Sequence, residues 1–169
     1  MEDKRLPLAR GSKRRIIGID PGLASTGWGL VEYAGSRVSY LAHGCIETRA
    51  SLPREERLFF IYTRINEVLD AWEPTEAAME TLYFGRNVSS AIAVAEARGV
   101  LSLAMAERNL PLKECTPHAI KQAVAGLRRA EKEQVQEMVR LILGLPVIPT
   151  PDHAADALGA AICAAHGSA

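Results

Sequence analysis

The sequence predicts an α/β fold with a mixed five-stranded sheet flanked by helices. Three consecutive strand patterns open the chain, and strand patterns then alternate with helical patterns. This order of elements is typical of a sheet that helices cover. At 169 residues, the chain is long enough for one domain with a hydrophobic core and too short for two domains of ordinary size.

The first three strands are expected to form an antiparallel meander. Residues 14–20 (RRIIGID) are a buried strand that ends in a Pro-Gly turn. Residues 26–33 and 37–48 are two further strands, which the turn Ala34-Gly35-Ser36 joins as a hairpin. Residues 1–13 carry little apolar periodicity, so we expect a flexible basic tail there and a single domain over residues 14–169.

Two strands and five helices are expected in the rest of the chain. Apolar residues recur at helical spacing from Pro53 to Trp72, and Pro74 ends that helix. The remaining elements are a strand over 76–82, a helix over 88–108, a strand over 112–116, and helices over 117–124, 131–143 and 152–166. Proline at position 117 suits the first turn of a helix, and Asp152 is expected to be the N-cap of the last one.

Charge and cysteine content limit the classes of function. The formal net charge is zero, whereas a DNA-binding domain is usually basic. Lys and Arg nevertheless cluster in residues 1–15 and again in residues 113–140, so local patches must supply the affinity if DNA is the partner. The three scattered cysteines are typical of reduced thiols in a cytoplasmic protein. No segment approaches the roughly 20 apolar residues of a membrane span, so we expect no membrane association.

Two carboxylates stand where the hydrophobic pattern predicts strands. Asp20 follows a buried strand directly, and ligands of open α/β sheets gather at such strand ends. It could also cap a tight turn, and the same GID-x-G pattern opens the sugar-kinase and actin-like ATPases. Glu80 interrupts an apolar strand, where an unpaired carboxylate is costly unless a cation or a strong hydrogen-bond donor accompanies it. The alternative is a Glu on an edge strand that faces solvent.

The last helix adds a histidine and a third carboxylate. His153 and Asp156 are three residues apart and therefore share one face. Favourable placement near the helix N-terminus explains the acidic residues in part, and a lone His is often a plain surface residue. Taken together, Asp20, Glu80, His153 and Asp156 suit Mg²⁺ or Mn²⁺. Two such ions can activate a water and stabilise the leaving oxygen of a phosphodiester.

Six segments of the chain resemble the RuvC-type Holliday junction resolvases. They come in the order found in that family and span Arg14 to His166. The segments are Ile17-Gly18-Ile19-Asp20-Pro21-Gly22, Gly44-Cys45-Ile46, Glu80 followed by Tyr83, Glu96-Ala97-Arg98-Gly99, Ala130-Glu131-Lys132-Glu133-Gln134-Val135-Gln136, and Ala154-Ala155-Asp156-Ala157-Leu158.

The resemblance implies a ribonuclease H-like fold and a homodimer that nicks two strands of a four-way DNA junction symmetrically, with divalent metal, during recombination and repair. It also implies cooperation with the branch-migration complex of the same pathway. The catalytic and metal-binding roles fall on Asp20, Glu80 and Asp156. His153 stands where the best-known family pattern has an aspartate, and its imidazole tilts the expected preference toward Mn²⁺.

The resemblance further implies contacts with DNA. Lys121 and Lys132 match lysines near the scissile phosphate, where fixed positive charge can offset charge that develops in the transition state. Tyr83 matches an aromatic that can stack on an unpaired base. Possible phosphate contacts, on less specific grounds, are Arg86, Asn87, Arg128 and Arg129. Solvated surface charge is the alternative explanation for each basic residue.

Three other functions compete with this one. An actin-like or sugar-kinase nucleotide-binding domain would need a second phosphate loop and a second domain, for which the chain has no room. RuvC-like nucleases that act on ribosomal RNA precursors are shorter and lack the segments that contact the junction. A junction-binding scaffold without activity is the third, and three intact carboxylates argue against it.

Overall fold

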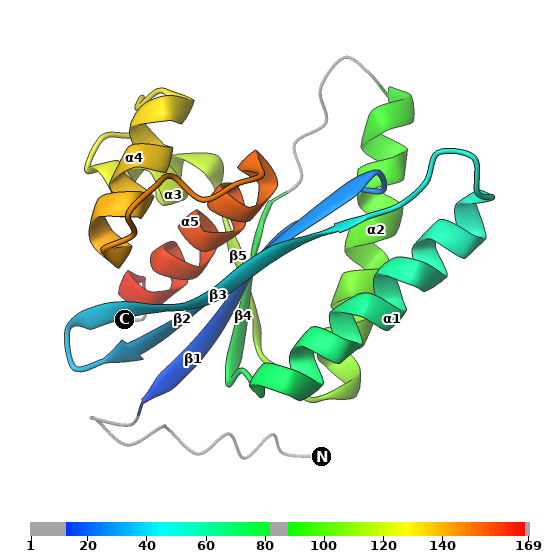
Figure 1. Ribbon diagram of the computed structural model, residues 1–169, viewed down its shortest axis with the longest axis horizontal. Coiled ribbons are helices and arrows are strands. Elements are labelled where there is room, and N and C mark those ends of the chain that lie inside the picture. The colour runs from blue at the N-terminus through cyan, green and yellow to red at the C-terminus, as the bar shows by residue number, and fades with distance from the viewer. Residues whose placement is uncertain (1–12, 82–87, 168–169) are drawn as a thin grey trace.

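The computed structural model describes residues 13–81 and 88–167. A five-stranded sheet with the order β3-β2-β1-β4-β5 forms its middle layer. Helices α1 and α2 cover one face of this sheet, and α3, α4 and α5 cover the other (Figure 1). The mixed five-stranded sheet flanked by helices is therefore confirmed.

The strands follow the predicted meander and then turn parallel. Their bounds are β1 Arg14–Asp20, β2 Ser25–Ala34, β3 Arg37–Glu47, β4 Glu76–Glu80 and β5 Leu112–Cys115. β2 runs antiparallel to both β1 and β3, whereas β4 runs parallel to β1 and β5 parallel to β4. Gly35, with φ of 65°, makes the hairpin turn between β2 and β3, a conformation that glycine adopts without steric cost.

The helices lie where the apolar spacing predicts them. Their bounds are α1 Arg54–Trp72, α2 Val88–Glu107, α3 Pro117–Ala125, α4 Lys132–Leu143 and α5 Asp152–His166. The Thr116 side chain caps α3 by accepting from the Ala119 N–H at 3.1 Å. Glu131 and Gln134 form a capping box that fixes Lys132 as the first residue of α4. No helix among the described residues is long and apolar enough to cross a membrane.

Two local predictions are wrong. Asp152 is not the N-cap of α5: Pro151 takes that position in an extended conformation, with φ of −70° and ψ of 172°. The Asp152 carboxylate is drawn instead to α4, where its Oδ2 lies 3.2 Å from Lys132 Nζ. Strand β4 ends at Glu80, before the predicted end at residue 82. Lys13 pairs with Glu32 at 3.1 Å, and the rest of the predicted basic tail lies outside the described residues.

The side chains of the sheet divide the core into two halves. Ile16 of β1 packs against α3, α4 and α5, while its neighbours Ile17 and Ile19 pack against α1 and α2. On the α5 side the backbones approach so closely that a Cβ added at Gly18 would lie 1.9 Å from the carbonyl oxygen of Ala157. At Gly27, the added Cβ would lie 2.0 Å from the carbonyl oxygen of His153. Only glycine fits these two positions.

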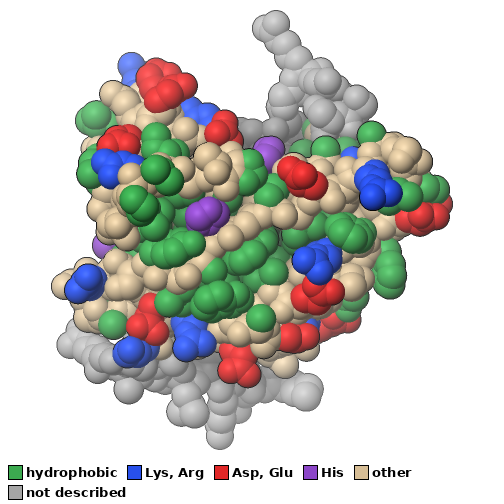
Figure 2. All heavy atoms as spheres, in the orientation of Figure 1, with side chains coloured by type: hydrophobic (Ala, Val, Ile, Leu, Met, Phe, Trp, Pro, Cys, Tyr) green, Lys and Arg blue, Asp and Glu red, His purple; other side chains and the backbone are tan. Residues whose placement is uncertain are grey.

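The surface shows why the net charge is uninformative. On the face drawn in Figure 2, acidic and basic side chains are interspersed and neither sign dominates. A binding function must therefore be sought in local groups of side chains.

Candidate active site

Asp20 and Glu80 are the last residues of two adjacent strands, so they lie at the same end and on the same face of the sheet. The parallel register pairs Ile19 with Met79, so Asp20 and Glu80 are next in line on β1 and β4. Because side chains alternate along a strand, both residues share the face on which Gly18 and Ala78 meet α5. β4 lies between β1 and β5, which excludes the alternative of an edge-strand Glu.

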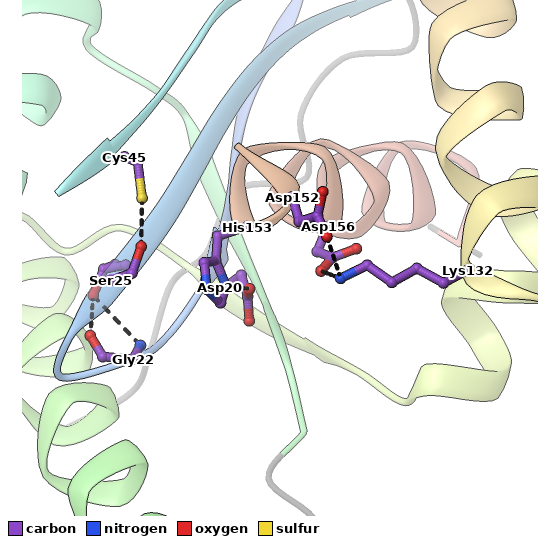
Figure 3. A network of polar contacts seen from close by, with 9 residues as sticks. Asp20, Gly22, Ser25, Cys45, Lys132, Asp152, His153 and Asp156 are labelled. Atoms are coloured by element: carbon purple, nitrogen blue, oxygen red, sulfur yellow. Dashed lines mark hydrogen bonds and ion pairs between the residues drawn. The ribbon is translucent and has the colours of Figure 1, made fainter. Parts of the chain in front are cut away.

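The first turn of α5 completes one side of the site. His153 Nδ1 lies 2.6 Å from Asp20 Oδ2, and Figure 3 shows the two side chains meeting where β1 ends. An ionised carboxylate only accepts hydrogen bonds, so Nδ1 is the donor in this pair, and in a neutral imidazole Nε2 would hold the lone pair. The turn after β1 is closed by the buried Thr26, whose hydroxyl donates to the Gly22 carbonyl at 2.7 Å. The position of Asp20 is thus fixed from both sides.

Asp156 lies one turn further along α5 and contacts a lysine. Its Oδ2 is 3.3 Å from Lys132 Nζ, which also contacts Asp152 (Figure 3). Burial alone would lower the pKa of Lys132, but the hydrogen bonds and charges of the two aspartates outweigh it and raise this pKa. The ammonium therefore remains charged at neutral pH and holds the start of α4 against the start of α5.

The carboxylates at the strand ends are costly to ionise. Burial raises the pKa of Asp20, and the hydrogen bond from His153 offsets only part of this effect. Burial also raises the pKa of Glu80, and repulsion from Asp20 and Asp156 raises it further. A site in which burial and neighbouring acidic groups oppose the ionisation of Asp20 and Glu80 is one that a cation would stabilise.

Two cavities adjoin Glu80. One, of about 210 Å³, has Glu80, Asp156, Lys121 and Lys132 in its wall. The other, of about 340 Å³, is lined by Glu80, Asp20 and Arg98. Glu80 and Pro117 line both, so Glu80 stands between the space beside Asp156 and the space beside Asp20.

The donor set fits a divalent cation by its chemistry. Carboxylate oxygens with one imidazole are ligands that Mg²⁺ and Mn²⁺ accept, and the raised pKa values show charge that such an ion would neutralise. Within residues 13–81 and 88–167, no three His, Cys, Asp or Glu side chains are gathered closely enough to hold one ion as they lie. Asp156 Oδ2 is instead paired with Lys132 Nζ at 3.3 Å.

The other residues expected at the site fall into three groups. Lys121 and Lys132 lie in the wall of the cavity that also contains Glu80 and Asp156. Arg128 and Arg129 are exposed on the connection between α3 and α4. Tyr83, Arg86 and Asn87 lie outside the described residues.

Sequence analysis did not identify Arg98 as a functional residue, but the structure places it at the site. This α2 residue lines the cavity beside Asp20 and donates a hydrogen bond to the backbone carbonyl of Glu80. The available signal was that Arg98 and Glu96 are the two charged residues in an otherwise small and largely apolar stretch of α2. Its target could not be read from that pattern.

A mixed sheet with acidic side chains at the ends of its two adjacent central strands defines the class: a nuclease of ribonuclease H-like fold. A family model described as "Crossover junction endodeoxyribonuclease RuvC" matches residues 16–164. This chain belongs to that RuvC family of endonucleases.

Individual relatives agree over nearly the whole chain. The crossover junction endodeoxyribonuclease RuvC of Treponema denticola is 50% identical over 147 residues, which cover 87% of this chain and 83% of that protein. The one from Thermotoga maritima is 50% identical over 149 residues, 88% of this chain and 89% of that protein. A solved structure of T. thermophilus RuvC in complex with Holliday junction substrate is similar with a TM-score of 0.85 and 37% identity, covering 89% of this chain and 92% of that one. The expected family and the ribonuclease H-like fold are confirmed.

The electrostatic cost at Glu80 predicts a stabilising substitution. Glu80→Gln should raise the unfolding midpoint of the metal-free protein at pH 7, because the amide needs no charge at a partly buried position between two acids. Solvent screens the effect, so we expect a rise of a few degrees, the range that about 1 kcal/mol produces in a chain of this size.

The pH dependence gives this prediction its sign. A pKa raised above the ordinary 4.5 means that the folded protein holds a proton which the unfolded chain has released. Stability is therefore lost as pH rises from 4.5 toward the raised value, and the advantage of Glu80→Gln should be larger at pH 7 than at pH 4. Glu133→Gln removes an exposed carboxylate from the first turn of α4 and should be neutral or slightly destabilising. Equal effects of the two changes would contradict the electrostatic account.

Proposed function

We propose that this protein resolves four-way DNA junctions by hydrolysing one phosphodiester in each of two opposed strands with a divalent metal. One observation carries this proposal. At the strand ends, Glu80 lies close to two other carboxylates, Asp20 and Asp156, and shares a cavity wall with the two lysines Lys121 and Lys132. Its solved relative is described in complex with a Holliday junction substrate, which gives the substrate class.

The acidic residues are proposed to hold the metal. Asp20 and Glu80 extend from the strand ends, and Asp156 and His153 Nε2 face them from α5. Mg²⁺ and Mn²⁺ both suit these donors, and two ions would supply an activated water and charge compensation at the leaving oxygen.

The lysines are proposed to bind the phosphate. Lys121 and Lys132 point fixed positive charge into the cavity beside Glu80, where it can offset charge that develops on the phosphate. In the metal-free protein Lys132 is held by Asp152 and Asp156. If Asp156 held a metal, the Lys132 ammonium would be free to contact a phosphate oxygen, so the same residue would serve as a counter-ion before binding and as a phosphate ligand afterwards.

Further DNA contacts are proposed at the rim. Arg128 and Arg129 are exposed beside α4, at the end of the molecule that carries Lys132. Tyr83 is proposed to stack on an unpaired base, and Arg86 and Asn87 to contact phosphates, on the family resemblance. Such a function fits a reducing cytoplasm, where the three cysteines stay free, and work alongside the branch-migration complex of the same pathway.

A homodimer is proposed because symmetric nicking needs two equivalent sites. An exposed stripe on α2 favours this assembly: Ile92, Gly99 and Leu103 lie on one face, and Ile92 and Leu103 are 47% and 54% exposed. Gly99 has no atom within 4 Å of an added Cβ, so a second helix could approach closely there. Phe59 on α1 is 70% exposed and adds apolar surface to this side of the sheet.

A nicking assay tests the function. Wild-type protein should cut two opposed strands of a labelled four-way junction with Mg²⁺ or Mn²⁺ and leave a linear duplex of the same sequence intact. Asp20→Asn should reduce the single-turnover rate by several orders of magnitude. Junction binding should be kept or slightly tightened, because a negative charge near phosphate is removed.

Asp70→Asn is the matched control, since Asp70 pairs with Arg108 far from the strand ends. It should nick at the wild-type rate. Cleavage by Asp20→Asn at that rate would remove Asp20 from the mechanism. A wild type that binds the junction and nicks it with neither ion would instead be the inactive scaffold.

A second assay tests the role of His153. Wild type should nick faster with Mn²⁺ than with Mg²⁺, and His153→Asp should recover Mg²⁺ activity, because Mg²⁺ prefers oxygen ligands. The substitution also places a second carboxylate against Asp20, so without metal it should lower the unfolding midpoint. An Ala variant with unchanged rate and metal preference would show that His153 is not a ligand.

A third experiment tests the dimer. Leu103→Asp should convert the protein to monomer in sedimentation velocity at micromolar concentration, because it buries a charge in the proposed α2 contact. Leu141→Asp on α4 is a matched control, since Leu141 is 53% exposed and lies on the opposite side of the sheet. A wild type that is monomeric with and without junction DNA would overturn the proposal.

A further inference from the structure

Within residues 13–81 and 88–167, the carbonyl of the last β4 peptide has no backbone N–H opposite it in the sheet. The N–H groups of Ala77 and Thr81 donate toward β5, to Pro111 and Cys115, each at 2.8 Å. In a parallel strand, the residues between these two bond to the opposite neighbour, which is β1. The carbonyl of Glu80 belongs to the same peptide as the Thr81 N–H, so it points toward β1.

The residue that should donate to this carbonyl follows β1 directly and is a proline. On the other side of β4, Ala77 is opposite Leu112 and its N–H reaches the residue before Leu112, as a parallel ladder requires. The same rule applied to Gly18 opposite Ala78 makes residue 21 the donor to the Glu80 carbonyl. Pro21 has no N–H. The Glu80 carbonyl points toward β1, and leaving it without a hydrogen-bond donor would cost free energy of folding.

Arg98 supplies the missing hydrogen bond. Its Nη1 donates to the Glu80 carbonyl, and its Nη2 donates to the carboxylate of Glu114 on β5. The Arg98 side chain is only 15% exposed whereas Glu114 is 60% exposed, so the bond to the Glu80 carbonyl is the better shielded from water. One rigid guanidinium thus ties α2 to β4 and β5 at the point where the chain leaves the sheet.

We propose that Arg98 is a positioning residue for Glu80. Its guanidinium replaces the N–H that Pro21 lacks, fixes the last peptide of β4, and so directs the Glu80 carboxylate to the place between the two cavities. This inference rests on the proposed role of Glu80 as a metal ligand. A ligand displaced by even about 1 Å can cost roughly 100-fold in rate.

The test uses four variants of the full chain: Arg98→Gln, Arg98→Lys, Pro21→Ala and the double variant Pro21→Ala/Arg98→Gln. Three quantities are measured: the unfolding midpoint without metal, the affinity of the free protein for Mn²⁺ by calorimetry, and the single-turnover nicking rate on a saturating junction. Arg98→Gln should weaken Mn²⁺ binding and slow nicking by about 10- to 100-fold, with junction affinity little changed.

The other variants separate geometry from charge. Arg98→Lys keeps the charge but cannot reach both acceptors with a fixed fork, so it should stay impaired. In the Pro21→Ala background, residue 21 regains an N–H. Removal of Arg98 should then cost less in all three measurements than it does in the wild type.

Arg108→Gln is the matched control. Arg108 also donates to two acceptors, Asn66 and Asp70, and so ties the end of α2 to α1, but it lies away from the strand ends that carry Asp20 and Glu80. It should lower the unfolding midpoint and leave Mn²⁺ affinity and nicking unchanged.

Three results would overturn the inference: Arg98→Gln and Arg108→Gln alike in Mn²⁺ affinity, full activity in Arg98→Lys, or an equal loss with and without Pro21. The proposed function fails separately. If Mn²⁺ binding depends on Arg98 but wild type nicks no junction, the positioning role stands and the junction-resolving function falls.

Discussion

Helix α5 lies directly on the backbone of β1 and β2, and the site depends on this contact. Gly18 and Gly27 have no side chain to keep the helix at a distance, and the face of α5 that packs on them is rich in buried alanines. Because the side chains at this contact are small or absent, the helix packs close to the sheet, and its first turn lies beside the end of β1. The contact between His153 and Asp20 follows from this close packing of α5 on the sheet.

The electrostatics of the site follow from the same close packing of α5 on the sheet. A close helix brings Asp156 into the range of Asp20 and Glu80, and burial keeps water from screening them well. Lys132 partly neutralises this charge from α4, a separate element. The protein therefore holds its acidic groups together at a cost in stability, a pattern that is common where a fold has to bind a cation.

Much of the fold could be predicted because apolar spacing is a local property. β1 and α5 have the predicted bounds, and the other elements differ by few residues. Asp152 shows the limit of such reasoning: Asp before an apolar run is a frequent N-cap, but a lysine 20 positions earlier in the chain takes its carboxylate. That competition exists only after α4 and α5 have packed.

The site was predictable as a set of residues and not as an arrangement. Strand ends and a shared helix face pointed to Asp20, Glu80, His153 and Asp156. Which of them touch depends on strand register and on helix seating, which no local pattern encodes. Arg98 was missed for this reason, since the gap it fills appears only when Pro21 is set opposite the end of β4.

The close packing of α5 on the sheet also determines which positions of the site can be substituted in the course of evolution and which cannot. A larger residue at Gly18 or Gly27 would push α5 away from the sheet and shift His153 and Asp156 relative to Asp20 and Glu80, so these two positions do not tolerate substitution. His153 contacts Asp20 through one nitrogen and its side chain is 48% exposed, so its chemistry can change while the framework stays in place. With the proposed role of His153 as a metal ligand, a single substitution there would change the metal preference without any change of the backbone.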